Sequence, residues 1–365
     1  MMEYKVYKWS DVLTIINGRN QNAVECEDGE YPIYGSGGVM GKANDYLCPP
    51  NCTIIGRKGN INKPIYVETK FWNVDTAFGL SANEEILNPR YLYYFCVDYN
   101  FERHNKAVTI PSLTKADLLK IEMCLPPLDK QKSIVGELDK INELIRLKKE
   151  QLIDYDNLAQ SIFYEMFGDP VVNEKGWDFK KIGEIGTVER GAGISKKDFV
   201  EDGLPCIHYG QLHTILGPTT RHHHSCIPES LLPKYKIAHT NDVIMAITSE
   251  DVEGSCKSTA WLGNYDIVIG SDAAILHHEQ DGTFLSYYTM TKAFFNEKSK
   301  YAKGFKVTHI SAKEIENIPV YLPPLALQKD FAKRIEVIEQ QKENIKSTIQ
   351  DLETLLASRM QYWFD

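Results

Sequence analysis

Three short segments carry residue types that could do chemistry. The segment GSGGVMGKA, residues 35–43, is rich in glycine and contains a lysine, as a phosphate-binding loop does. The segment CPPNC, residues 48–52, places two thiols around a double proline, and RHHHSC, residues 221–226, combines imidazoles with a thiol, which are metal-ligand types. Phosphate transfer, amino-group methylation and metal binding are therefore the chemistries to examine first.

None of the three segments has the spacing that its chemistry requires. The phosphate-binding loop needs glycine where Ser36 stands and Ser or Thr where Ala43 stands. CPPNC lacks the Asp or Asn before the prolines, and the aromatic residue after them, with which adenine methyltransferases hold the target amino group. The consecutive histidines point in different directions, which favours a polar loop. The zinc-protease, nucleophile-elbow and dinucleotide motifs are also missing, so we expect a chain that recognises a target without catalysis, cofactor or metal.

Composition indicates a globular chain without a basic surplus. The 365 residues allow two or three domains. The formal net charge is −9, and none of the predicted domains is basic, which counts against a simple polyanion binder. The N-terminus lacks the apolar segment of a signal peptide, so a cytoplasmic location is expected. The eight cysteines are too sparse for a disulfide scaffold, and we expect buried free thiols.

An internal repeat organises the chain. LPPLDKQKSIV, which begins at Leu125, and LPPLALQKDFA, which begins at Leu322, align without gaps, and the same offset pairs Asp75 with Asp272 further upstream. Near the start of each half the offset is smaller, so the second copy has gained residues in its middle. The repeat predicts two globular heads, each followed by a tail, related by a pseudo-twofold axis.

The two tails are predicted to be long helices. After each double proline, which disfavours helix in the residue before it, apolar residues recur at alternating steps of four and three, as in a coiled-coil seam. The helices have equal lengths of about 57 Å, and an antiparallel pair joins them without a long linker. The residues that we expect to face the partner helix are Gln131, Ile134, Leu138, Ile141 and Ile145, and Gln328, Phe331, Ile335, Ile338 and Ile345.

Each head has a mixed pattern of strands and helices. CTIIGRKG, KPIYVET and DVIMAIT are typical of short strands, and NPRYLYYFCVDYNF and GTFLSYYTMTKAFFNEKS are typical of helices whose aromatic stripe belongs to the core. The predicted fold class is α/β in the mixed α+β sense. The predicted domains are a first head at 1–127, a first helix at 128–168, a linker and second head at 169–324, and a second helix at 325–365.

These segments carry a family resemblance. LPPLDKQKSIV, SIFYEMFGDPVVNEKGW, and GRKGNINKPIYV with FWNVDTAF resemble the specificity subunit of type I restriction–modification systems, in matching order along nearly the whole chain. The resemblance implies that each head reads one half of a split DNA target and that the helices set the number of unread base pairs between the halves. It also implies a non-catalytic chain, two adenine-methyltransferase modification subunits that carry S-adenosylmethionine, and, in some systems, restriction subunits with motor and nuclease.

Base readout requires hydrogen-bonding side chains at base edges. In the first head, GRKGNINK matches the strand–turn–strand of the family, and its glycines permit close backbone approach. In the second head TSEDVEGSCKS occupies the same place but replaces the basic pair with acidic residues, so HYGQLH and KGFK are added as candidates. The candidate DNA-binding residues are Ser36, Arg57, Lys58, Asn60, Asn62, Lys63 and Lys106 in the first head, and His208, Tyr209, Gln211, His213, Lys257, Ser258, Lys303 and Lys306 in the second.

Because the two heads differ at these positions, we expect an asymmetric DNA target. Two other functions remain open from the sequence. The chain could serve a type IIB enzyme or a methylation-only complex, or it could be a coiled-coil scaffold whose heads bind proteins, which the acidic charge favours. A self-sufficient nuclease or methyltransferase would require a catalytic motif that the chain lacks. Target bases and spacer length do not follow from the sequence.

Overall fold

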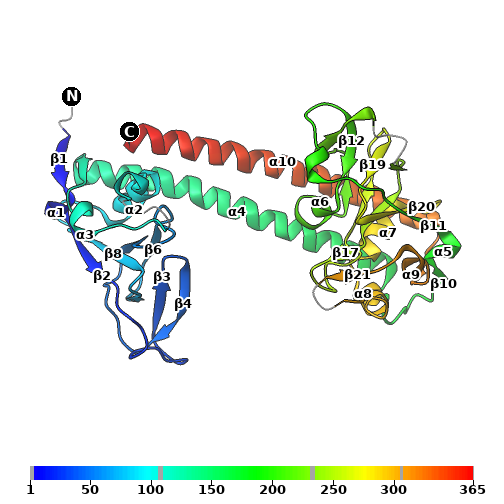
Figure 1. The fold of residues 1–365 in the computed structure, drawn as a ribbon, viewed down its shortest axis with the longest axis horizontal. Coiled ribbons are helices and arrows are strands. Elements are labelled where there is room, and N and C mark those ends of the chain that lie inside the picture. The colour runs from blue at the N-terminus through cyan, green and yellow to red at the C-terminus, as the bar shows by residue number, and fades with distance from the viewer. Residues whose placement is uncertain (1–3, 106–109, 231–234, 305–306, 365) are drawn as a thin grey trace. The chain divides into compact units, whose positions relative to one another are not determined.

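The computed structural model describes residues 4–105, 110–230, 235–304 and 307–364 (Figure 1). The chain forms two compact units: the first comprises Met1–Glu150 and Lys346–Asp365, and the second comprises Gln151–Ile345. Two long helices, α4 (Leu128–Phe167) and α10 (Leu325–Phe364), each contribute residues to both units. Among the described residues, no helix combines the length and the apolar character that crossing a membrane requires.

The first head is built on small, mostly antiparallel sheets. Its central sheet has the strand order β2-β8-β5-β6, a second sheet has the order β4-β3-β7, and β1 pairs with β9. These elements and the helices beside them are β1 (Lys5–Lys8), α1 (Trp9–Val12), β2 (Leu13–Asn17), β3 (Tyr31–Gly35), β4 (Gly38–Ala43), β5 (Cys52–Gly56), β6 (Ile65–Val67), β7 (Trp72–Asn73), β8 (Ala77–Ala82), α2 (Pro89–Asp98), η1 (Phe101–His104), α3 (Lys115–Leu118) and β9 (Glu122–Leu125).

The second head is larger. Its central sheet has the order β11-β20-β16-β18-β13, a second sheet has the order β14-β12-β19-β15, and two further pairs are β10-β22 and β17-β21. The elements are β10 (Phe179–Lys181), α5 (Ile182–Ile185), β11 (Gly186–Arg190), η2 (Lys196–Asp198), β12 (Leu204–Ile207), α6 (Tyr209–Thr214), β13 (Thr219–Thr220), β14 (Ser225–Ile227), β15 (Lys236–Ala238), β16 (Val243–Ala246), β17 (Thr248–Ser249), β18 (Ser258–Trp261), β19 (Ile267–Ile269), β20 (Ala273–His278), α7 (Gly282–Tyr288), α8 (Lys292–Lys298), β21 (Thr308–His309), α9 (Ala312–Glu316) and β22 (Pro319–Tyr321).

The predicted internal repeat is present in the topology. The order β2-β8-β5-β6 of the first head corresponds to β11-β20-β16-β18 of the second. In the smaller sheets, β3 pairs antiparallel with β4 and parallel with β7, and β12 repeats both pairings with β14 and β19. The extra elements of the second head, α6, β13 and β15, lie in its middle, where the alignment indicates added residues.

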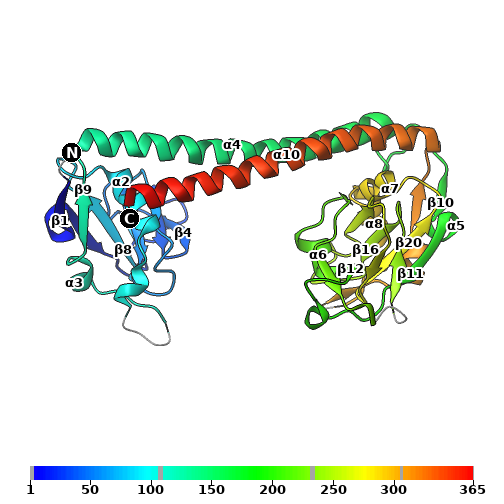
Figure 2. The same cartoon turned by 90° about the horizontal axis from the view of Figure 1, so that it is seen from above.

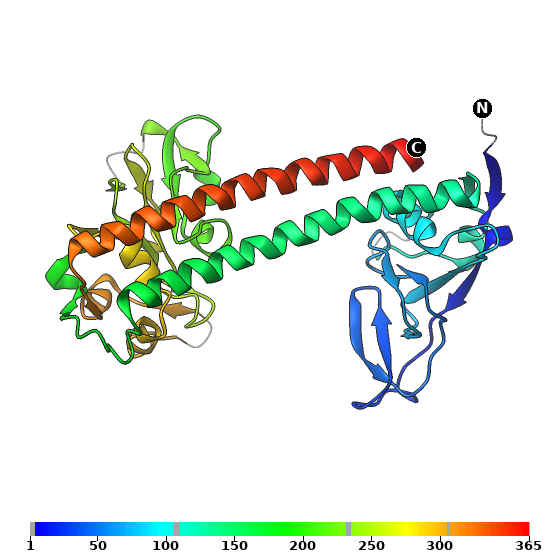
Figure 3. The ribbon, with the colours of Figure 1, turned by 180° about the vertical axis from the view of Figure 1, so that it is seen from behind.

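The two long helices pack antiparallel, as predicted (Figures 2 and 3). In the first unit Glu137 of α4 pairs with Arg359 of α10, and Lys149 pairs with Glu353 at 2.8 Å. In the second unit the ring of Phe163 lies against that of Phe331, with their centroids 5.6 Å apart. The residue number rises along α4 as it falls along α10, which defines the opposite directions. The apolar seam residues from Ile134 to Ile145 and from Phe331 to Ile345 are buried.

Two expectations for the heads were wrong in detail. The predicted helix over GTFLSYYTMTKAFFNEKS is two helices, α7 and α8, because the Thr291 side chain accepts a hydrogen bond from the N–H of Phe294 and starts a new helix. The cysteines are free, but Cys26 and Cys124 are exposed. Cys124 lies on β9 between buried Met123 and Leu125, so strand alternation turns its thiol outward.

Candidate nucleic-acid interface

The loop at residues 57–63 joins β5 to β6 and has a fixed backbone. We call it the first reading loop because the sequence predicts that its side chains read bases. The N–H groups of Arg57 and Lys58 donate to the Thr76 carbonyl at 2.8 and 3.2 Å, and the Arg57 carbonyl accepts from the N–H of Leu113 at 2.9 Å. A Cβ at Gly56 would lie 2.4 Å from the Asn60 carbonyl oxygen, so the tight turn requires glycine there. This frame leaves exposed the side chains of Arg57, Lys58, Asn60 and Lys63.

Asn62 has a different role from the other polar residues of this loop. Its side-chain oxygen accepts a hydrogen bond from the backbone N–H of Phe101 at 2.8 Å, and its amide nitrogen donates to the side-chain oxygen of Asn100 at 3.3 Å. Both partners lie just after α2. The Asn62 amide therefore attaches the loop to the head. Because Asn62 is also exposed, the base contact that the sequence predicts for it stays a prediction.

The second reading loop, residues 250–257, precedes β18 and presents charged side chains. Glu250, Asp251, Glu253 and Lys257 are exposed. The Lys257 ammonium donates to the backbone carbonyl of His213 at 3.2 Å. The loop can therefore offer carboxylate acceptors and one ammonium to a ligand, whereas the first reading loop offers cations and amides.

Ser258, the last candidate of this segment, is buried in the second head. Its hydroxyl bonds with the hydroxyls of Ser286 at 3.2 Å and Thr289 at 2.6 Å. These contacts connect β18 to α7 and its C-terminal end. Ser258 therefore stabilises the head in this structure instead of facing a ligand, which differs from the expectation.

The HYGQLH segment forms α6 and its N-terminal cap. The Gln211 side chain accepts from the N–H of His208 at 2.9 Å and donates to the Ser225 hydroxyl at 2.9 Å, and His208 Nδ1 accepts from the N–H of Gly210 at 3.1 Å. Both side chains are buried, and burial lowers the pKa of the His208 imidazole. This differs from the expectation, because only half-buried Tyr209 and His213 of this segment stay accessible.

The remaining candidates lie in hairpins and loops. Ser36 and Gly37 form the turn between β3 and β4, so the glycine-rich segment is a hairpin rather than a phosphate loop before a helix. Lys303 is exposed and pairs with Glu314 at 2.8 Å, so a phosphate would have to compete with that carboxylate. Lys106 and Lys306 lie outside the described residues.

One buried glutamine attaches each head to the helix that follows it. Gln131 accepts from the N–H of Asn88 and donates to the carbonyls of Ile86 and Pro126, both at 2.9 Å. Gln328 accepts from the N–H of Asp281 and donates to Gln280 and to the Pro323 carbonyl. We expected these two residues to face the partner helix. In the structure their amides bind the head that precedes their own helix instead.

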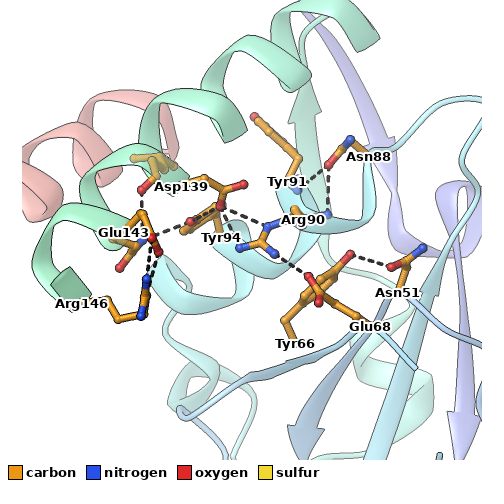
Figure 4. Close-up of polar contacts among 12 residues, drawn as sticks. Asn51, Tyr66, Glu68, Asn88, Arg90, Tyr91, Tyr94, Asp139, Glu143 and Arg146 are labelled. Carbon is orange, nitrogen blue, oxygen red and sulfur yellow. Dashed lines mark hydrogen bonds and ion pairs between the residues drawn. The ribbon is translucent and has the colours of Figure 1, made fainter. Parts of the chain in front are cut away.

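A polar network adds to the attachment of the first head (Figure 4). Arg90 on α2 donates to the Asp139 carboxylate of α4 at 3.1 Å and pairs with Glu68 at 3.0 Å, and the Tyr94 hydroxyl donates to Asp139 at 2.6 Å. These residues are not among the candidates that the sequence predicted. The signal was the acidic residue that both tails carry eight positions after the repeated glutamine.

The second tail uses its equivalent acidic residue in a comparable way. Glu336 aligns with Asp139 and pairs with Arg221 of the second head at 2.7 Å. Arg221 belongs to the middle region in which the second head has gained residues. The two heads therefore use different arginines to reach the same position of the tail.

The buried seam between the helices includes one lysine. The Lys342 ammonium pairs with Asp156 at 2.7 Å and Glu339 at 2.8 Å. Burial alone would lower the pKa of Lys342, but the two carboxylates raise it above its usual value. Lys342 occupies a seam position where the other turns have an apolar residue, and the two carboxylates compensate its buried charge.

Comparisons with known proteins agree with the repeat. The family model described as "Type I restriction modification DNA specificity domain" matches residues 1–154 and 174–354. The type I restriction enzyme MjaVIII specificity subunit of Methanocaldococcus jannaschii is 23% identical over 97% of this chain and 92% of its own length. The EcoDI specificity subunit of Escherichia coli is 20% identical over 96% of this chain and 86% of its own length.

Two solved structures share the fold. The S subunit of a type I restriction–modification system from M. genitalium superposes with a TM-score of 0.61 at 13% identity, covering 100% of this chain and 96% of the other. A chain from a study of complex assembly and conformational transition in a type I system gives 0.57 at 17% identity, covering 98% and 96%. At these identities the likeness establishes the fold alone.

Proposed function

Because the chain belongs to the family of type I restriction–modification DNA specificity domains, we propose that it directs its complex to a split DNA sequence. Each head reads one half of the target, and the antiparallel helices set the number of base pairs between the halves. The chain contributes recognition without catalysis. It acts in the cytoplasm, where a host-defence complex meets DNA. A specificity subunit of a type IIB or methylation-only system would work by the same geometry.

The duplicated attachment of head to helix is the observation that carries this proposal. Gln131 and Gln328 make equivalent contacts with the residues that begin α2 and α7. A fixed attachment in each half is what a spacer ruler needs, because a head that rotates freely on its helix would read half-sites at variable distances. Asp139 and Glu336 reinforce it from equivalent positions.

The reading surfaces of this proposal are the side chains that the heads leave accessible. For the first head they are Ser36, Arg57, Lys58, Asn60, Asn62 and Lys63. Lys106 lies outside the described residues and stays a candidate from the sequence alone. For the second head they are Tyr209, His213, Lys257 and Lys303. Lys306 lies outside the described residues and stays a candidate from the sequence alone. Arg suits guanine and Asn suits adenine, whereas the second loop offers carboxylates that suit the amino group of cytosine. This difference supports an asymmetric target.

The acidic balance of the chain supports basic partners on the DNA. A net charge of −9 leaves little capacity to neutralise phosphates over a long site. Two copies of an adenine-methyltransferase modification subunit would supply that contact together with S-adenosylmethionine, and they would dock on the helices and heads of this chain. Restriction subunits would add motor and nuclease functions.

One experiment tests the proposal directly. The chain is expressed with the modification subunit of its own system in a host without adenine methylation, and the methylome is sequenced by single-molecule methods. We expect one asymmetric motif with two specified halves and a constant unspecified spacer, which disappears when this chain is left out. Methylation at unsplit sites, or a motif that is independent of this chain, would refute the proposed function.

A further inference from the structure

A buried lysine supports the second reading loop from inside the head. Lys298, the last residue of α8, is 4% exposed. Its ammonium donates to the backbone carbonyls of Glu253 at 2.8 Å and Ser255 at 2.5 Å. The nitrogen lies 5.5 Å from the centre of the Phe295 ring. The amine therefore binds two carbonyls of a single loop.

Burying this ammonium has an energetic cost that the core itself does not require. A charge taken out of water is unfavourable unless hydrogen bonds compensate it, and burial lowers the pKa of Lys298. An apolar side chain would fill the same buried space beside Phe295 without that cost. Only the hydrogen bonds to the Glu253 and Ser255 carbonyls require a lysine here. The amine therefore stabilises the conformation of the loop.

Contacts within the loop restrict it to the same conformation. The Asp251 carboxylate accepts from the N–H of Gly254 at 2.7 Å, and the Ser255 hydroxyl donates to the Val252 carbonyl at 2.7 Å. Cys256 has a φ of 55°, which is unusual for a residue other than glycine. A Cβ at Gly254 would lie 2.3 Å from the hydroxyl oxygen of Ser249. The exposed charges of the loop are therefore presented on an ordered backbone.

The first head attaches its reading loop at the corresponding place with the roles reversed. There the loop supplies the side chain, Asn62, and the segment just after α2 supplies the backbone N–H of Phe101. In the second head the end of α8 supplies the side chain and the loop supplies the backbone. The two attachments occupy equivalent places along the chain. In the first head the attaching segment follows β8 and α2, and in the second head it follows β20 and α7. Two unlike chemistries thus connect the same two parts of the fold.

We propose that Lys298 and Asn62 are positioning residues, each of which sets the specificity of one half-site by fixing a reading loop. This inference rests on the proposed function. A recognition side chain must be held within roughly half an ångström of its productive position, and neither of these residues needs to touch DNA to provide that. Loss of the attachment leaves the head folded but allows its loop to accept wrong bases.

The test uses the full chain assembled with its modification subunits. Dissociation constants are measured for the cognate duplex and for duplexes with one base pair changed in either half-site. Lys298→Met is expected to reduce discrimination roughly tenfold in the half-site read by the second head, with the other half unchanged. Asn62→Ala is expected to reduce discrimination in the half-site read by the first head, with the other half unchanged. Asn62→Asp keeps the acceptor for the Phe101 N–H and should retain discrimination.

Matched controls separate this role from general stability. Lys300→Met changes an exposed lysine near the end of α8, and Asn22→Ala changes an exposed asparagine of the first head. Neither should alter discrimination. Gly254→Ala disturbs the second loop while Lys298 stays in place, so it provides a second variant if Lys298→Met does not fold, with the same expected effect on one half-site.

Each outcome bears on the inference. Equal losses at both half-sites would show general destabilisation and would overturn it, as would unchanged discrimination in folded Lys298→Met or Gly254→Ala. A wild-type complex that recognises no split sequence would instead refute the proposed function, and the positioning roles with it. Hydrogen exchange of the free chain gives a direct check. The amides of residues 253–256 should exchange faster in Lys298→Met than in the wild type, and their exchange rates should be unchanged in Lys300→Met.

Discussion

The side-chain oxygen of Gln131 accepts a hydrogen bond from the backbone N–H of Asn88 at 2.8 Å. Asn88 is the N-cap of α2, and the same relationship joins Gln328 to Asp281, the N-cap of α7, at 3.0 Å. The glutamine shared by the two copies of the repeated motif therefore serves the same contact twice. It connects the first turn of each long helix to the start of a head helix.

Replacing Gln131 with leucine is expected to destabilise the first unit. The change leaves the N–H of Asn88 and the carbonyls of Ile86 and Pro126 without this partner in a site where Gln131 is 1% exposed. Buried groups without partners cost about 1–3 kcal/mol each, and a combined loss of about 3 kcal/mol is expected. Hydrogen exchange of first-unit amides in increasing urea measures it. Lys132→Leu, at an exposed position in the first-unit part of α4, should change stability by less than about 0.5 kcal/mol.

Arg57 and Lys63 are expected to contribute to DNA binding in different ways. Arg57 has an exposed side chain on a backbone fixed at its N–H and its carbonyl, which suits base readout. Arg57→Ala should cost about 1–3 kcal/mol on the cognate duplex and relax one position of the first half-site. Lys63→Ala should weaken binding to all duplexes alike and reduce the salt dependence by about one phosphate contact. Titrations at several salt concentrations distinguish the two, and identical profiles would contradict the assignment.

The carboxylate of Glu314 makes the second unit sensitive to acid. A hydrogen bond from Lys303, with others from Ser311, lowers the pKa of Glu314 from 4.5 to about 2. A lowered pKa in the folded state means that the contribution to stability is complete above pH 4.5 and is lost as the pH falls toward 2. Glu314→Gln should therefore be less stable than the wild type near neutral pH, and the difference should shrink below pH 4.5. Urea unfolding at stepwise pH measures this difference.

Lys303→Met provides the matched variant for that measurement. It removes the ion pair but keeps the carboxylate and its bonds to Ser311. The pKa of Glu314 should rise toward its usual value, so the acid-sensitive window should become narrower than in the wild type. An unchanged window would assign the shift to Ser311 alone.

Exchanging the first head should change one half of the target only. Residues 1–125 are replaced with the head of another member of the family, and the helices and the second head are kept. Because each head has its own core and its own attachment to the helix, the methylated motif should retain the other half and the spacer length. Methylome sequencing reads both halves at once, and a change in both would exclude independent heads.

Inserting one heptad into each long helix should lengthen the spacer. Seven residues after Glu150 and seven after Ile345 preserve the apolar seam and add about 10 Å of helix. At about 3.4 Å per base pair this corresponds to roughly three base pairs. Both half-sites should stay as in the wild type. A methylated motif with the original spacer would remove the ruler from the proposed function.

Local signals in the sequence were enough to predict the architecture of the chain. The repeated LPPL segments, the seam spacing from Ile134 to Ile145 and the glycine–proline stop after Phe167 depend on contacts between near neighbours in the chain or on periodicity. Such signals survive in a single sequence because helix geometry relates residues three and four positions apart. The antiparallel direction followed from the short linker, since chain length limits which ends can meet.

The tertiary structure, in contrast, was needed to show which polar side chains form hydrogen bonds with the protein itself. His208, Gln211, Ser258 and Asn62 have the residue types of base readers, yet their hydrogen bonds go to the protein. The bonds between His208 and Gln211 are local and form a helix cap. The partners of Asn62 and Ser258, Phe101 and Thr289, lie 39 and 31 residues away, and no local pattern encodes those two pairings. Lys298 could not be predicted from the sequence for the same reason, because its amine binds carbonyls that lie 43 and 45 residues away in the chain. Whether a polar group faces a ligand or the protein depends on which distant backbone groups the fold leaves beside it.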